Sequence, residues 1–126
     1  MARCDVVICL APLTTQTRGM IAAGQVSAMR PGTVFVNVSR GLVVQTSALV
    51  ERLVRGDIIA CLDVFDPEPI PVDHVVRTLP NVFLTPHIAG VTAACEPRFF
   101  DYMVDEVLRA LEGYRPRHEL IPREAP

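Results

Sequence analysis

The chain has 126 residues, of which 50% are hydrophobic and 21% are charged, and its formal net charge is −2 at pH 7. That length allows one small domain, or part of one, around a single hydrophobic core. The apolar runs are far shorter than the ~18 residues that a membrane-spanning helix requires, and the arginines are scattered along the chain. We therefore expect neither a membrane protein nor a nucleic-acid-binding protein.

Cysteine usage and the first residues bear on the cellular compartment. The N-terminus passes directly into an apolar run and contains no secretory signal peptide. The four cysteines show no CxxC spacing, and three of them sit in apolar runs; they are Cys4, Cys9, Cys61 and Cys95. We expect buried free thiols rather than disulfides or metal ligands, which favours a reducing cytoplasm.

Short strands and helices alternate along the first two thirds of the chain. Runs rich in Val, Ile and Leu, bounded by Pro, Gly and Asp, predict strands at 5–10, 33–38, 57–63 and 82–85. A helix is expected from about residue 18 to 29 with Thr17 as its N-cap, and a second up to Arg55 that Thr46 or Ser47 caps. The prolines of segment 66–71 exclude a helix or a central strand there, and a short helical turn is expected within 72–77.

The last third predicts one long helix from about Val91 to Tyr114, with Pro97 kinking it or opening its main part. Its apolar positions follow the i, i+3, i+4, i+7 spacing of an amphipathic helix. They are Phe100, Met103, Val104, Val107, Leu108 and Leu111. The charged, proline-containing tail 115–126 is expected to be loose.

This order of elements predicts an α/β fold: a partial doubly wound parallel, Rossmann-like sheet covered by helices on both faces, with a long C-terminal helix. In such sheets, ligands bind beyond the carboxyl ends of the strands. Polar residues stand at those places. Arg40 follows the second strand, Asp63 closes the third with Glu68 five residues on, and His87 follows the fourth. Taken singly, each of them is equally compatible with an ordinary structural or surface role.

Together, these residues fit the interconversion of an alcohol and a ketone. A histidine can exchange the hydroxyl proton near neutral pH, and an adjacent carboxylate such as Glu68 would fix its tautomer and favour its protonated form. Arg40 could bind a carboxylate bidentately and so orient a 2-oxo or 2-hydroxy acid. A metal site is the weaker alternative, because His74, His87 and His118 have no ligand-like spacing.

Three segments resemble successive signatures of the D-isomer-specific 2-hydroxyacid dehydrogenases. They are residues 37–41 (NVSRG), 62–69 (LDVFDPEP) and 85–90 (TPHIAG). Residues 10–14 (LAPLT) and 17–21 (TRGMI) are similar to the same family's loop near the cofactor. The segments stand in the family's order and at its approximate spacing, so the resemblance runs from about Asp5 to about Leu111.

The resemblance implies an NAD(P)-dependent oxidoreductase that acts on the CH–OH group of a D-2-hydroxy acid. It makes Arg40 the binder of the substrate carboxylate, His87 the general acid/base with Glu68 as its partner, and Asp63 the binder of the nicotinamide carboxamide. The cofactor contacts that it implies, largely through backbone, are Ala11, Val38, Ser39, Arg40, Asp63, His87, Ile88, Ala89 and Gly90. The expected cofactor is NAD, with NADP an open alternative, and no metal is expected. Formate dehydrogenases resemble the same pattern with glutamine in place of Glu68, so a hydroxy acid is the favoured substrate.

By the same resemblance, residues 1–90 correspond to the C-terminal part of the NAD(P)-binding Rossmann domain, 91–114 to a C-terminal helix and 115–126 to a tail. No GxGxxG phosphate-binding loop occurs in the sequence, and the family's substrate-binding domain is missing. We therefore expect a truncated chain that is inactive alone and whose full-length form is a homodimer. The alternative is a non-catalytic module of the same fold that serves dimerisation or partner binding. The intact Arg40, Glu68 and His87 favour the enzyme.

Overall fold

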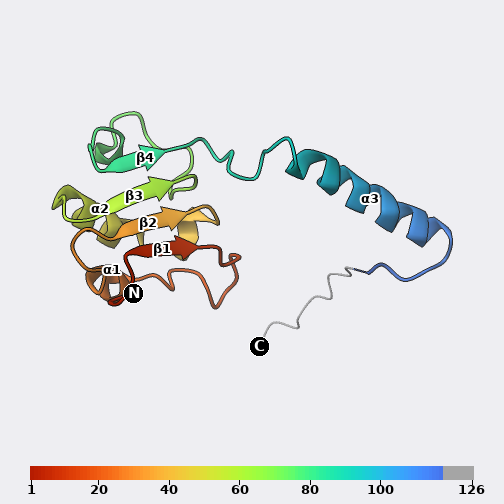
Figure 1. Cartoon of the computed structure of the whole chain (residues 1–126), viewed down its shortest axis with the longest axis horizontal. Coiled ribbons are helices and arrows are strands. Elements are labelled where there is room, and N and C mark those ends of the chain that lie inside the picture. Colours follow the sequence, from red (N-terminus) through yellow and green to blue (C-terminus); the bar gives the residue numbers. More distant parts are fainter. Residues whose placement is uncertain (118–126) are drawn as a thin grey trace. The chain divides into compact units, whose positions relative to one another are not determined.

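The computed structural model describes residues 1–117, which separate into two compact units, Met1–Ala89 and the segment from Gly90 onward. The first unit contains β1 (Val6–Cys9), α1 (Ala23–Ser27), β2 (Val34–Asn37), η1 (Gly41–Val43), α2 (Thr46–Val54), β3 (Ile59–Leu62), η2 (Val75–Arg77) and β4 (Val82–Leu84), where η marks a 3-10 helix. The second unit contains α3 (Cys95–Leu111) (Figure 1). Most of the tail that was expected to be loose, residues 118–126, lies outside the described residues.

The four strands form one parallel sheet in the order β1-β2-β3-β4, as Figure 1 shows. This confirms the predicted α/β class with its parallel, Rossmann-like sheet and long C-terminal helix. Each strand pairs with the next strand of the chain, so all four carboxyl ends lie at one edge of the sheet. That edge is where the candidate residues after β2, β3 and β4 come together.

The core lies on one face of the sheet, between the strands and the pair α1 and α2. Phe35 of β2 and Ala60 of β3 are fully buried, and α2 contributes the buried Leu49 and Leu53. Burying a side chain of the size of leucine or phenylalanine stabilises the fold by roughly 1.5–3 kcal/mol. This packing fixes the strands and so provides a rigid base for their carboxyl ends.

Within residues 1–89, helices cover one face of the sheet and not the other, although the sequence predicted helices on both faces. The side chains of the other face are apolar and lie in register across the strands; they are Val6, Ile8, Val34, Val36, Ile59, Cys61 and Phe83. Ile8 is 59% exposed and Phe83 is 64% exposed. We call this surface the open sheet face. Successive right-handed crossovers in one direction along a sheet place their helices on the same side, which explains why α1 and α2 contact each other and leave this face bare within residues 1–89.

The helix α1 begins at Ala23 rather than near residue 18, and Thr17 is not its N-cap. Instead, the Thr17 hydroxyl donates to the carbonyl of Pro12 at 2.6 Å and closes its own loop. Ile21 forms a parallel β-bridge with Val44, so the residues before α1 make their hydrogen bonds across the fold. These long-range bonds replace the first turns of the predicted helix.

The predicted cap of α2 is also wrong in detail. Its N-cap is Gln45, rather than Thr46 or Ser47, and the Gln45 side chain does not cap α2. Gln45 Oε1 accepts the backbone N–H of Ala23 at 3.1 Å instead, at the start of α1. One side chain therefore links the beginnings of the two helices that cover the core.

The four cysteines are free, as predicted, but only Cys9 is buried. Cys61 is partly exposed because it lies on the open sheet face, and Cys4 and Cys95 are exposed. An apolar sequence neighbourhood therefore predicted the burial of only one thiol correctly.

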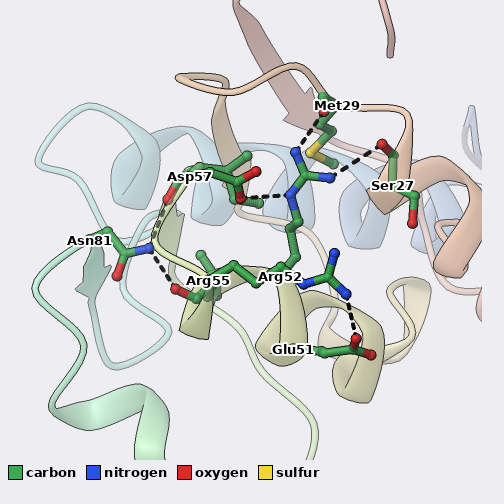
Figure 2. Close-up of polar contacts among 9 residues, drawn as sticks. Ser27, Met29, Glu51, Arg52, Arg55, Asp57 and Asn81 are labelled. Carbon is green, nitrogen blue, oxygen red and sulfur yellow. Dashed lines mark hydrogen bonds and ion pairs between the residues drawn. The ribbon is translucent and has the colours of Figure 1, made fainter.

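Polar contacts fasten the amino-terminal edge of the sheet, opposite the candidate site (Figure 2). The Arg52 guanidinium, 11% exposed as a side chain, pairs with Asp57 at 2.7 Å just before β3. It also donates to the carbonyl of Ser27, the last residue of α1, at 3.3 Å and to that of Met29, just beyond α1, at 2.9 Å. Asn81 donates to the carbonyl of Leu53, in the last turn of α2, at 2.9 Å and to that of Ile58, just before β3, at 2.8 Å. These contacts join both helices to the starts of β3 and β4.

The second unit consists mainly of α3, in which Pro97 stands in the first turn, where its missing N–H costs nothing. The predicted apolar stripe of α3 is exposed along its whole length. Within residues 1–117, no helix is both long enough and apolar enough to cross a membrane.

Candidate active site

Asn37, the last residue of β2, shapes the turn that carries Arg40. Its buried side-chain oxygen accepts the Ser39 backbone N–H at 3.1 Å and the Ser39 hydroxyl at 2.9 Å, and its amide nitrogen donates to the Arg40 carbonyl at 3.1 Å. A Cβ added at Gly41 would lie 2.1 Å from the Phe65 carbonyl oxygen, so only glycine allows this close approach. The Arg40 turn is thereby packed against the segment that leads from β3 toward Glu68.

Arg40 itself is exposed, and one of its terminal nitrogens donates to the Ser39 carbonyl at 2.7 Å. The guanidinium has five N–H donors, so this contact fixes the side chain and leaves donors for a ligand. A planar fork of this kind suits a carboxylate. The structure thus places Arg40 at the predicted edge of the sheet, one strand away from Asp63.

Asp63 follows β3 directly and is 5% exposed. One carboxylate oxygen accepts the Thr85 hydroxyl at 2.6 Å and the Ile88 N–H at 2.8 Å, and the other accepts the Ala89 N–H at 2.9 Å. All three donors belong to the segment that follows β4. The buried carboxylate therefore holds this segment in place.

These contacts also set the protonation state of Asp63. Burial by itself raises the pKa of the Asp63 carboxyl. The hydrogen bonds from Thr85, Ala89 and Ile88, together with the charge of a protonated His87, outweigh burial and lower the pKa below its ordinary value of 3.8. Asp63 is therefore a carboxylate at neutral pH.

His87 sits at the centre of the segment that Asp63 holds. Its φ is +57°, in the left-handed region that residues other than glycine rarely adopt, and its N–H donates to the Asp63 carbonyl at 3.0 Å. Such backbone conformations cost energy and persist where the surroundings enforce them. Here the enforcing contacts are those of Asp63, on both sides of His87.

The side chain of Glu68, from the proline-rich loop, contacts the ring of His87. Glu68 Oε1 lies 2.6 Å from His87 Nδ1, and the two side chains are 43% and 45% exposed. An ionised carboxylate only accepts hydrogen bonds, so Nδ1 carries a proton and donates. In the neutral ring Nε2 then holds the lone pair, and in the imidazolium Nε2 carries the second proton. The pair is thus arranged to take up and release a proton at Nε2.

A cavity of about 340 Å³ lies beside this pair. Its walls are mainly apolar and include Phe65, Ile70 and Leu84, while Glu68 and His87 contribute polar groups. A small, largely apolar cavity with a few converging polar groups is the usual form of a site for a small molecule. No group of three or more His, Cys, Asp or Glu side chains in the described part of the chain could hold a metal ion.

The other residues that the sequence predicted for the cofactor divide into three groups. Ala11 and Val38 follow β1 and β2 at the same edge, and Ser39 is buried there, with its hydroxyl 3.2 Å from the Cys9 sulfur. The N–H groups of Ile88 and Ala89 donate to Asp63, so a backbone contact of these two residues with a cofactor would use their carbonyls. Gly90 begins the second unit, and its predicted role stays a prediction.

Sequence reasoning missed three residues that shape the site. Thr85 and Asn37 lie within the recognised segments, and a polar residue at the end of an apolar strand is the signal that could have drawn attention to them. Arg77 lines the cavity, but it follows an irregular loop, and nothing in its local sequence connects it with Glu68.

Comparison with known proteins agrees with this geometry. Residues 1–89 match the family model described as "D-isomer specific 2-hydroxyacid dehydrogenase, NAD binding domain". The chain belongs to the D-isomer specific 2-hydroxyacid dehydrogenase family.

Two curated relatives and one solved structure show how similar individual proteins are to this chain. Glyoxylate/hydroxypyruvate reductase B of Pectobacterium carotovorum subsp. carotovorum is 40% identical over 114 residues, which are 90% of this chain and 36% of that protein. A mitochondrial formate dehydrogenase of Hordeum vulgare is 36% identical over 114 residues, 90% of this chain and 30% of that protein. The crystal structure of a D-isomer specific 2-hydroxyacid dehydrogenase from Xanthobacter autotrophicus, in complex with NADPH and MES, matches with a TM-score of 0.84 and 35% identity over 96% of this chain and 50% of the other. The chain thus spans about a third of the length of the curated relatives that it matches.

Proposed function

We propose that this chain carries the proton-transfer half of an NAD(P)-dependent oxidoreductase that interconverts 2-oxo acids and D-2-hydroxy acids. The observation that carries the proposal is the contact of 2.6 Å between Glu68 Oε1 and His87 Nδ1 at the carboxyl edge of the sheet. A module that only binds a partner has no chemical need for a histidine that is held in a left-handed conformation, paired with a carboxylate and placed in the wall of a cavity.

In the proposed reaction, His87 gives the proton on Nε2 to the carbonyl oxygen of the 2-oxo acid during reduction, and takes it back during oxidation. Glu68 stabilises the imidazolium and keeps Nε2 directed away from itself. Arg40 binds the substrate carboxylate and so fixes the orientation of the neighbouring carbonyl. A nicotinamide cofactor, when bound, supplies the hydride.

Asp63 offers a chemical fit to that cofactor. One of its oxygens accepts two hydrogen bonds from this chain and the other accepts one, from Ala89. A carboxylate has about four acceptor positions, so Asp63 retains capacity for a carboxamide N–H. Nothing in the 126 residues supplies a GxGxxG loop for the pyrophosphate, and we therefore propose that the chain does not turn over substrate by itself.

Glyoxylate and hydroxypyruvate, named by the reductase relative, are the substrates that we propose first. Formate is the competing substrate, because a formate dehydrogenase is nearly as similar. The pair of Glu68 with His87 favours a 2-oxo acid, because an ionised carboxylate stabilises the imidazolium that donates the proton. Hydride removal from formate leaves carbon dioxide and needs no such proton donor.

The alternative function is a non-catalytic module that associates through its apolar surfaces. The open sheet face and the exposed stripe of α3 support association, and we propose that the full-length form is a homodimer. We also propose that the protein works in the cytoplasm, because all four cysteines are free thiols and two of them are exposed. A net charge of −2 offers no general attraction for the phosphates of a nucleic acid, so we propose a small organic acid, held locally by Arg40, as the ligand.

A chimera can distinguish the proposed enzyme from the non-catalytic module. Residues 1–126 replace the matching segment of the Pectobacterium reductase, and the oxidation of NADH and NADPH is followed with glyoxylate, hydroxypyruvate and pyruvate, and the reduction of NAD with formate. The proposal expects reduction of at least one 2-oxo acid and no oxidation of formate. A folded chimera that binds NADPH but reduces none of the three acids would support the non-catalytic module.

A further inference from the structure

Arg77, the last residue of η2, is joined to the loop that carries Glu68. Its Nε donates to the Pro71 carbonyl at 2.9 Å, and one terminal nitrogen donates to the Ile70 carbonyl at 2.6 Å. Segment 66–71 contains three prolines, which have no N–H to donate. The loop therefore has few donors of its own, and Arg77 donates to two of its adjacent carbonyls. The Pro71 carbonyl also accepts the His74 N–H at 3.1 Å, so Arg77 is the side chain that extends this anchoring to Ile70.

The element that holds Arg77 also packs beside the strand that leads to His87. η2 contacts β4, and Val76 of η2 is buried in the core. His74 steadies η2, because its Nδ1 accepts the Val76 N–H at 3.2 Å. The packed pair of η2 and β4 therefore leads directly to His87 and also contacts the Glu68 loop through Arg77.

We infer that Arg77 is a positioning residue for the Glu68–His87 pair: by holding the carbonyls of Ile70 and Pro71, it keeps the Glu68 carboxylate within hydrogen-bond distance of His87 Nδ1. The described residues show no ion pair between Arg77 and Glu68, so the effect passes through the loop backbone. Its meaning for catalysis rests on the proposed function, but the contact itself can be measured without turnover.

The loop has a second anchor, which makes the inference testable. Ile70 packs partly against the hydrophobic core, so loss of the Arg77 contacts loosens the loop without releasing it. Arg77 is exposed, and its replacement leaves no buried charge behind. Arg77→Met is therefore expected to fold, with the Glu68 carboxylate no longer held at a fixed distance.

The test uses the 126-residue chain labelled with 15N-histidine at about pH 9, where imidazole is neutral. The ratio of the Nδ1–H to the Nε2–H tautomer of His87 reports the contact, and His87→Asn assigns the signals. The hydrogen bond to Glu68 favours the Nδ1–H tautomer, so removal of Arg77 is expected to lower this ratio, by about threefold or more. A larger change is not required, because a half-exposed hydrogen bond to a charged partner is weaker than a buried one. The midpoint of thermal unfolding should match that of Arg55→Met, which removes an exposed arginine paired with Glu51 on α2.

Glu68→Ala serves as the reference for complete loss of the contact. If Glu68→Ala lowers the ratio but Arg77→Met leaves it at the wild-type value, the inference about Arg77 is overturned while the pair stands. If neither variant changes the ratio, the pair does not form in solution, and the role of Glu68 falls together with that of Arg77. Arg77→Gln decides in the same way should Arg77→Met fail to fold, and a lowered ratio in Arg55→Met would also overturn the inference.

Discussion

Asp63 holds His87 through both its backbone and its side chain. The Asp63 carbonyl accepts the His87 N–H at 3.0 Å, while the Asp63 carboxylate accepts the next two backbone N–H groups, at 2.8 and 2.9 Å. The φ of +57° at His87 is the conformation that these contacts enforce. The residue proposed to bind the cofactor is therefore also the residue that fixes the geometry of the proposed acid/base.

Replacing Asp63 by asparagine should destabilise the fold. An amide offers one acceptor oxygen where the carboxylate offers two, so one part-buried N–H group loses its partner, at a cost of about 1–3 kcal/mol in the free energy of unfolding. Urea denaturation measures this difference. The control is Asp5→Asn, which removes an exposed ion pair with Arg30 and should change the free energy by less than about 0.5 kcal/mol. Equal effects of the two substitutions would contradict the role of Asp63.

The same contacts predict a dependence on pH with a definite sign. The pKa of Asp63 is lowered in the folded state, so its ionised form stabilises the fold above the ordinary value of 3.8, and the stabilisation is lost as the pH falls through the lower folded pKa. The difference in unfolding free energy between the wild type and Asp63→Asn should be retained down to about pH 5 and shrink below about pH 4. A difference that grows below about pH 4 would show that the ionised carboxylate does not stabilise the fold.

Arg52 should matter for stability and not for the site. Arg52→Met removes three hydrogen bonds at the amino-terminal edge of the sheet (Figure 2) and leaves the carbonyls of Ser27 and Met29, at the end of α1 and just beyond it, without this donor. The expected loss is about 1–3 kcal/mol in the free energy of unfolding. Arg55→Met, whose partner Glu51 is exposed, should cost less than about 0.5 kcal/mol. The His87 tautomer ratio should be unchanged in both variants, and a change in Arg52→Met would contradict the separation of the two edges.

The open sheet face should drive association of the isolated chain. Ile8 and Phe83 lie in one row across the sheet and are both more than half exposed, and large exposed apolar patches promote contact between molecules. The double change Ile8→Lys with Phe83→Lys should shift the sedimentation profile toward the monomer at a given concentration. Val72→Lys alters an exposed loop residue and serves as the control. If the double variant associates as strongly as the control, another surface is responsible.

The fold class followed from the sequence because local signals agreed with the final structure. The strands are short runs of β-branched residues between Pro, Gly and Asp, and their alternation with helices specifies a parallel sheet. The same rule brought Asp63 and His87 to one edge. The elements that pack on each face of the sheet could not be predicted in this way. A run of apolar residues indicates that a strand needs burial, but it does not indicate which other part of the chain buries it.

The details that failed depend on contacts between distant parts of the chain. Thr17 has the chemistry of an N-cap, but the bridge of Ile21 with Val44 prevents a helix from starting there. For Asp63 a structural role was left open beside the binding of a cofactor, but nothing local reveals that the backbone after β4 turns back to its carboxylate. The contacts of Arg77 with Ile70 and Pro71 depend in the same way on the path of an irregular loop.

The proposed acid/base role of His87 is tested most directly by kcat/KM of the chimera with His87 changed to asparagine. Asparagine can still donate a hydrogen bond but cannot exchange a proton near neutral pH. Loss of a general acid/base is expected to lower kcat/KM for the preferred 2-oxo acid by about 10²–10⁴-fold, while the affinity for NADPH stays at the value of the parent chimera. A variant that retains kcat/KM within about tenfold of the parent would contradict the assignment of His87.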